Sequence, residues 1–105
     1  MRSKALPVSR EELETIVHAR AMDSHNIDFT VHCLERLEER EITLIEALRC
    51  LRRGQIVGDI KHNQQLNTWK FRIQEPHPND IVCLVAAVSL DPSSREVIAI
   101  TVWEI

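Results

Sequence analysis

The hydrophobic periodicity of this chain changes at Gly54, and no other feature of the sequence limits the fold as strongly. Before Gly54, apolar residues recur every three to four positions, which is the spacing of one face of an α-helix. After Gly54 they recur at every second position, as they do along one face of a β-strand. Helices followed by strands, without alternation, predict an α+β fold.

Capping residues predict where the helices of the first half begin. Ser9 and Glu12 form a capping box that opens a helix running to about Met22. Turn-forming residues at 23–28 then end that helix. A second helix follows with Thr30 as its cap.

A third helix begins at Thr43, which forms a capping box with Glu46, and ends before Gly54. The strands of the second half are predicted at 55–63, 68–75, 80–90 and 97–105, with turns at 76–79 and 91–96. The stretch 80–90 is apolar on both faces and is therefore expected at the centre of the sheet. Short connections between sequential strands favour a four-stranded, mainly antiparallel sheet. Two to three N-terminal helices are expected to pack on one face of it.

Composition is typical of a soluble globular domain. The chain has 105 residues, of which 44% are hydrophobic and 28% charged. One domain over residues 1–105 is expected at this length. No apolar run is long enough to span a membrane, and residues 1–9 lack the apolar segment of a signal peptide. Three widely spaced cysteines, Cys33, Cys50 and Cys83, indicate buried free thiols, so a cytoplasmic location is expected.

Positive charge is concentrated in the middle of an acidic chain. The formal net charge is −3, yet residues 40–75 hold seven Lys and Arg against four Asp and Glu, a local excess of +3. This distribution allows an anionic ligand but is weaker than in most nucleic-acid-binding domains.

The second predicted helix carries three basic residues on one edge. His32, Arg36 and Arg40 recur every four residues and form a stripe along the border between its buried and exposed faces. Such a stripe can present its polar heads to a ligand. It can equally be structural, because Arg36 can pair with Glu39 one turn later.

Two more cations alternate with aromatic residues on the clearest strand. Lys70 and Arg72 point away from Trp69 and Phe71, and so away from the face that the helices are expected to cover. If the helical stripe lies at the edge of this sheet, the five basic side chains surround one shallow groove. Arginine binds phosphate and histidine moves protons near neutral pH, which suits RNA cleavage without a metal. The alternative is that Lys70 and Arg72 only keep an open sheet face soluble.

The segment from FTVHCLERLEER to GQIV and the ending VIAITVW resemble a family of small bacterial domains of unknown function. The shared pattern is a Phe/Tyr-Thr-x-His start, two arginines, an Ile-Ser/Thr step before a helix, and an Ile-Thr-Val-aromatic strand. The resemblance covers residues 29–105. That family is similar to RelE/ParE-type and MqsR-type toxins, which share a small α+β fold. Residues 1–28 lie outside it as an N-terminal helical extension of the toxin-like core.

The resemblance assigns functional positions and partners. By position it selects His32, Arg36, Arg40 and Thr101 as catalytic residues, with RNA as the substrate and an antitoxin protein as the partner. Lys70 and Arg72 are the expected phosphate-binding residues, and a homodimer is possible. One departure from the pattern is Glu41, where the family often has glycine.

Other kinds of site have little support in the sequence. His18, His25 and His32 recur every seven residues, but the turn at 23–28 separates them, so no metal site is expected. No nucleotide-binding loop is present, and no cofactor is expected. The leading hypothesis is a toxin-type, metal-independent endoribonuclease. The alternatives are a non-catalytic protein-binding module on the same fold, or a degenerate, inactive toxin.

Overall fold

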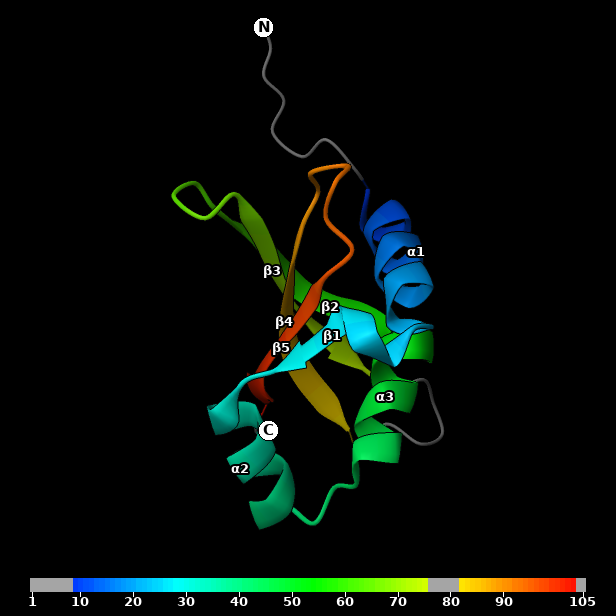
Figure 1. The fold of residues 1–105 in the computed structure, drawn as a ribbon, viewed down its shortest axis with the longest axis vertical. Coiled ribbons are helices and arrows are strands. Elements are labelled where there is room, and N and C mark those ends of the chain that lie inside the picture. The colour runs from blue at the N-terminus through cyan, green and yellow to red at the C-terminus, as the bar shows by residue number, and fades with distance from the viewer. Residues whose placement is uncertain (1–8, 76–81, 104–105) are drawn as a thin grey trace, which may run out of the picture.

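The computed structural model of the chain describes residues 9–75 and 82–103 (Figure 1). The predicted turn at 76–79 and residues 1–8 lie outside the described residues. The described elements are, in order, α1 (Arg10–Ala21), the 3₁₀ turn η1 (Ser24–Asn26), β1 (Ile27–Phe29), α2 (Val31–Glu39), α3 (Leu44–Arg53), β2 (Gln55–Asn63), β3 (Thr68–Gln74), β4 (Cys83–Ser89) and β5 (Val97–Val102). No helix within 9–75 or 82–103 is long and apolar enough to cross a membrane.

The strands form a single sheet in the order β1-β5-β4-β3-β2. All neighbouring strands are antiparallel except β1 and β5, which are parallel. The predicted α+β class and mainly antiparallel sheet are therefore confirmed. The prediction that 80–90 contains the central strand is also confirmed, because β4 occupies the middle of the sheet.

The prediction of four strands was wrong, because the described residues form a sheet of five. Residues 27–29 were assigned to the turn and to the helix entry, but they form β1 beside β5. Ile27 pairs with Val97 and Phe29 with Ala99. A strand of three residues is too short to show a period of two, so only its partner strand reveals it.

The hydrophobic core lies between the helices and one face of the sheet (Figure 1). Alternate residues of β3 and β4 point into it, including Phe71, Ile73, Leu84 and Ala86. Helices α1 and α3 lie side by side over this face, while α2 packs beside β5 at the end of the sheet. Within the described ranges the opposite sheet face has no helical cover.

The predicted helix caps are all present. The capping boxes at Ser9 and Thr43 are complete, and the Thr30 hydroxyl accepts a hydrogen bond from the backbone N–H of Cys33. Helix α2 ends in a Schellman motif, in which the N–H groups of Glu41 and Ile42 donate to carbonyls of the last turn. Glu41 takes the left-handed position of that motif, with φ at 57°.

Gly54 ends α3, as predicted, but not through a left-handed conformation. Its φ is −71°, and its backbone is extended. The reason for glycine here is close packing: a Cβ would collide with the carbonyl oxygen of Cys50 and lie 2.8 Å from Cγ1 of Ile73. The helix can therefore turn directly into β2 against the neighbouring strand β3.

Polar side chains of α1 bind the first residues of the edge strand β2. The Arg10 guanidinium donates to the Ile56 carbonyl, at 3.0 Å, and Glu14 accepts from the Ile56 N–H, at 3.0 Å. Nε2 of His18 lies 2.7 Å from the Gly54 carbonyl oxygen. Arg10, Glu14 and His18 recur every four positions and so lie on one face of α1. Their side chains hydrogen-bond to backbone groups of Gly54 and Ile56 that could otherwise pair with another strand.

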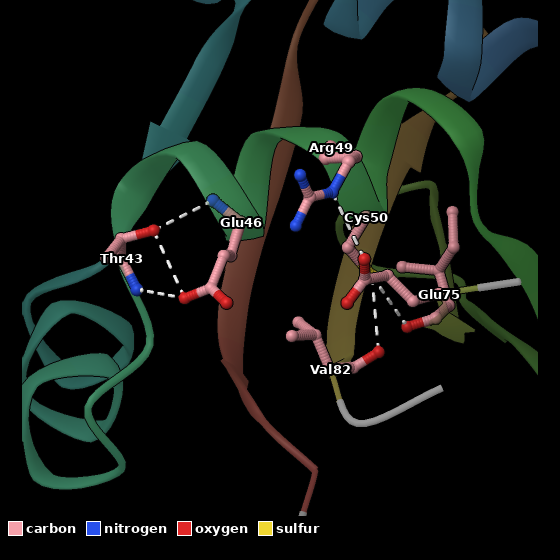
Figure 2. Close-up of polar contacts among 7 residues, drawn as sticks. Thr43, Glu46, Arg49, Cys50, Glu75 and Val82 are labelled. Carbon is pink, nitrogen blue, oxygen red and sulfur yellow. Dashed lines mark hydrogen bonds and ion pairs between the residues drawn. The ribbon is translucent and has the colours of Figure 1, made fainter. Parts of the chain in front are cut away.

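A buried carboxylate joins α3 to the end of β3 (Figure 2). Glu75 is only 4% exposed, and its Oε2 accepts a hydrogen bond from Nε of Arg49 at 3.2 Å. The Cys50 thiol donates to the backbone carbonyl of Ile73 in the same region, at 3.3 Å. Because a buried carboxylate needs a partner, this ion pair fixes α3 against the sheet.

Candidate functional site

The register of the sheet brings the open-face side chains into two rows. Arg72 on β3 pairs with Val85 on β4, which pairs with Thr101 on β5. One step along, Lys61 on β2 pairs with Lys70 on β3. Because side chains two residues apart share a face, these two rows lie next to each other on the face that the helices leave open.

A groove occupies this open face. Its first part has a volume of about 390 Å³ and is lined by Lys61, Lys70, Arg72, Thr101 and Trp103, among others. A second part, of about 590 Å³, shares Lys61 and Lys70 and continues toward the β2–β3 hairpin. We call these two parts together the sheet groove. Three of the six predicted site residues, Lys70, Arg72 and Thr101, therefore line one cavity.

Arg72 is the most firmly positioned cation in the sheet groove. Its guanidinium carbon lies 4.4 Å from the centroid of the Trp103 ring, a cation–π arrangement. On another side it lies against Gly58, where a Cβ would collide with Nη2. Stacking uses the face of the guanidinium and leaves its edge, which carries the N–H donors, for an anion.

Lys61 and Lys70 are direct cross-strand neighbours with like charge. Both are exposed, and Arg72 follows Lys70 on the same face of β3. Like charges placed opposite each other destabilise a sheet by a few tenths of a kcal/mol. Asp59 is the one carboxylate among the described lining residues, so the groove carries more positive than negative charge.

The α2 stripe does not line the sheet groove. His32 and Arg40 are exposed, and Arg36 is half-buried. Nη1 of Arg36 lies 3.2 Å from Oε1 of Glu39, the i,i+3 pair that the structural alternative predicted. His32, Arg36 and Arg40 are thus on one helix, while the other three predicted residues are on the sheet.

The start of α2 is nevertheless fixed to the strand that carries Thr101. The Thr30 hydroxyl donates to the Ile100 carbonyl at 2.7 Å, and the Thr30 N–H donates to the Ala99 carbonyl at 3.1 Å. Since β1 runs parallel to β5, α2 begins at the same end of the sheet as Thr101 and Trp103. His32, in the first turn of α2, belongs to that end of the molecule.

Lys61 and Trp103 line the groove but were not among the predicted site residues. Trp103 is two residues after Thr101, so a period of two would have placed both on one face. Lys61 lies on the weakest predicted strand, beyond a register shift between Val57 and Lys61. Its position opposite Lys70 depends on that irregularity, and the one local signal for it is Gly58, because an isolated glycine inside a strand often marks a bulge.

The three cysteines are free and buried, as predicted. Burial raises the pKa of the Cys33 thiol to about 11. Burial, with smaller contributions from Cys83 and Glu75, also raises the pKa of Cys50, and burial raises that of Cys83. Thiols held in the neutral form are poor nucleophiles and poor metal ligands.

Histidines 18, 25 and 32 occupy three different environments. His18 binds the Gly54 carbonyl, whereas His25 lies beside Asp23 with Nδ1 3.2 Å from Oδ1. Within residues 9–75 and 82–103, no three His, Cys, Asp or Glu side chains are grouped so that they could hold a metal ion.

A protein-family model described as "Domain of unknown function (DUF4258)" matches residues 29–104. The match begins at Phe29 and includes α2, α3, the sheet groove and the Ile-Thr-Val-Trp ending. It confirms the predicted resemblance to a family of small domains of unknown function. No curated protein and no solved structure matches the chain.

Proposed function

The chain belongs to the DUF4258 family, and we propose that it is a toxin-type endoribonuclease that cleaves RNA without a metal ion. The proposal includes a relationship to the RelE/ParE- and MqsR-type toxins. The observation that carries it is the convergence of Lys70, Arg72 and Thr101 in one groove on the open sheet face. Lys61 and Trp103 add a further cation and an aromatic ring to the same surface.

RNA cleavage requires a base, an acid and a cation that stabilises negative charge. His32, Arg72 and Lys70 can supply these three contributions. The ribose 2′-oxygen attacks the adjacent phosphorus, the bond from phosphorus to the 5′-oxygen breaks, and a 2′,3′-cyclic phosphate and a 5′-hydroxyl result. His32 lies outside the groove lining, so the proposal places the reacting phosphate at the end of the groove where α2 begins. There His32 takes the proton from the 2′-hydroxyl and returns it to the departing 5′-oxygen, so no proton is lost or gained overall. Arg72 and Lys70 stabilise the negative charge that develops on the phosphoryl oxygens.

The remaining predicted residues bind and orient the RNA. The Thr101 hydroxyl can donate to a phosphate oxygen from the end of β5. Arg36 and Arg40 on α2 would hold the strand that leaves the groove. Because α2 starts at the groove end of β5, one extended RNA strand can contact both surfaces.

The apolar lining of the sheet groove favours a second candidate, a protein-binding module. Val85, Ala87, Ile98 and Ile100 line the groove together with its cations. Such a mixed surface also suits an acidic, partly apolar segment of another protein, such as a cognate antitoxin or a second copy of this chain. An inactive toxin would retain this binding and lose turnover.

The test is RNA cleavage by the purified chain in EDTA, with products analysed for 2′,3′-cyclic phosphate ends. We expect cleavage by the wild type and a loss of at least about 100-fold in His32→Ala, the usual size of a general acid–base contribution. His25→Ala is the matched control, because its side chain is 95% exposed on η1 and lies outside the groove lining.

The outcomes separate the candidates. Cleavage that persists in His32→Ala removes His32 from the chemistry and keeps the nuclease. No cleavage by a folded wild type, together with tight binding of an acidic partner peptide, establishes the protein-binding module instead. Cleavage that EDTA abolishes contradicts the metal-independent mechanism.

A further inference from the structure

We infer that the sheet groove binds single-stranded RNA with one base stacked on Trp103 and consecutive phosphates at Arg72 and at the Lys61–Lys70 pair. This inference rests on the proposed function and specifies its substrate as an unpaired strand. It assigns Trp103 and Lys61 to RNA binding, in addition to the residues selected from the sequence.

Trp103 has the surface that a stacking platform needs. Arg72 covers one side of the ring, yet 42% of the residue remains exposed. The backbone N–H of Trp103 donates to the Cys83 carbonyl at 2.8 Å, which holds the residue beside β4 after β5 has ended. A ring that is held in place and still partly exposed can receive a base, and the cation stacked on it can strengthen that contact.

The spacing of the cations fits an extended strand. Lys70 and Arg72 are two residues apart on β3, which places their Cα atoms roughly 7 Å apart. Consecutive phosphates of an extended single strand are separated by a similar distance. Lys61 lies directly opposite Lys70, so two ammonium groups can share one phosphate while the Arg72 guanidinium binds the next.

The side chains that line the groove favour an unpaired strand over a duplex. The lining combines cations with apolar and aromatic side chains, a composition that contacts both phosphates and exposed base faces. A duplex presents phosphates and groove edges, and its base faces are stacked inside. The stacking surface of Trp103 would have no ligand in that case.

The binding experiment uses RNA that cannot be cleaved, so that binding is measured apart from turnover. A 2′-O-methyl hexaadenylate lacks the attacking hydroxyl, and its binding is followed by quenching of tryptophan fluorescence. We expect Trp103→Leu to weaken binding about 5- to 100-fold and to abolish the quenching, since stacking of one base contributes on that scale. Trp103→Phe should keep affinity within about threefold of the wild type.

Salt dependence tests the role of the cations. With two phosphates bound, one at Arg72 and one between Lys61 and Lys70, the plot of log affinity against log salt concentration should have a slope of about −1.4. The double variant Lys61→Ala/Lys70→Ala, which removes both cations from one phosphate, should reduce the magnitude of this slope by about 0.7, whereas Arg53→Ala, an exposed cation of α3, should leave it unchanged. Trp103→Leu should lower affinity but change the slope less than the loss of the lysines does, because it removes no positive charge.

Three results would overturn the inference. One is equal binding by the wild type and Trp103→Leu. The second is equal binding of the hexanucleotide and of an inorganic polyphosphate of the same charge, which has no base to stack. The third is preferential binding of a hexaglutamate peptide, which would make the groove a protein-docking surface. Stacking without cleavage of unmodified RNA would contradict only the proposed function, and cleavage without stacking would contradict only this inference.

Discussion

The substitution Gly58→Ala tests how Arg72 is held in the sheet groove. Gly58 has a φ of +72°, and a Cβ at this position would collide with Nη2 of Arg72 and lie 2.9 Å from its Cζ. The atoms in the way belong to the end of a flexible side chain, so the guanidinium can move aside. We therefore expect the variant to fold, with Arg72 displaced from Trp103.

The expected cost of Gly58→Ala has two parts. The left-handed backbone costs a residue with a Cβ about 1 to 2 kcal/mol. Displacement of Arg72 from Trp103 removes a cation–π contact of about 0.5 to 1 kcal/mol. In an Arg72→Ala background only the backbone part remains, because the contact is already absent. The double-mutant cycle should therefore give a coupling of about 0.5 to 1 kcal/mol.

Urea unfolding followed by far-UV circular dichroism measures the four stabilities of this cycle. Binding of the 2′-O-methyl hexanucleotide gives a second readout, which Gly58→Ala should weaken in the wild-type background only. The reasoning is refuted if Gly58→Ala costs the same in both backgrounds and leaves hexanucleotide binding unchanged. Arg72 would then not be held between Gly58 and Trp103 in solution.

Four further predictions concern the scaffold. Glu41→Gly should raise the free energy of unfolding by about 1 kcal/mol, seen as a higher urea midpoint, because glycine accepts the left-handed position of the Schellman motif. Arg49→Ala should cost about 2 kcal/mol in the same assay, but less than about 0.5 kcal/mol in a Glu75→Gln background, where no buried charge is left without its partner. The Cys33 thiol should react with a disulfide reagent at pH 8 at about 1% of its rate in the unfolded chain or less, because its pKa is raised from 9.0 to about 11. The same shift predicts that stability falls as pH rises from 9.0 toward 11, since the unfolded thiol ionises first.

Local signals in the sequence predicted most of the fold. The Ser9 and Thr43 capping boxes and the alternation along 68–74 involve residues within four positions of each other, and all three were correct. The strand β1 was missed because three residues carry no period. It exists because β5 provides a partner and because Thr30, directly after it, bonds to the backbone of β5.

The candidate site was predictable only in part, for a related reason. Lys70 and Arg72 were placed on the open face by alternation, a local property of β3. That Thr101 joins them depends on pairing through Val85, and pairing is a long-range property. Lys61 depends on the irregularity of β2 near Gly58, which alters its register against β3.

The placement of charge distinguishes the two basic surfaces of the molecule. On α2, Arg36 pairs with Glu39, so part of the positive charge of the stripe is already compensated. In the sheet groove, Lys61 faces Lys70 directly, an arrangement that weakens the sheet and that opposite charges in the same positions would avoid. A sheet face that needed charged residues only for solubility would favour opposite charges on neighbouring strands, because such cross-strand pairs also stabilise the sheet. On the inference above, an anion bound between the two lysines offsets this repulsion, and it should raise the free energy of unfolding by RT ln(1 + [L]/Kd), where [L] is the anion concentration.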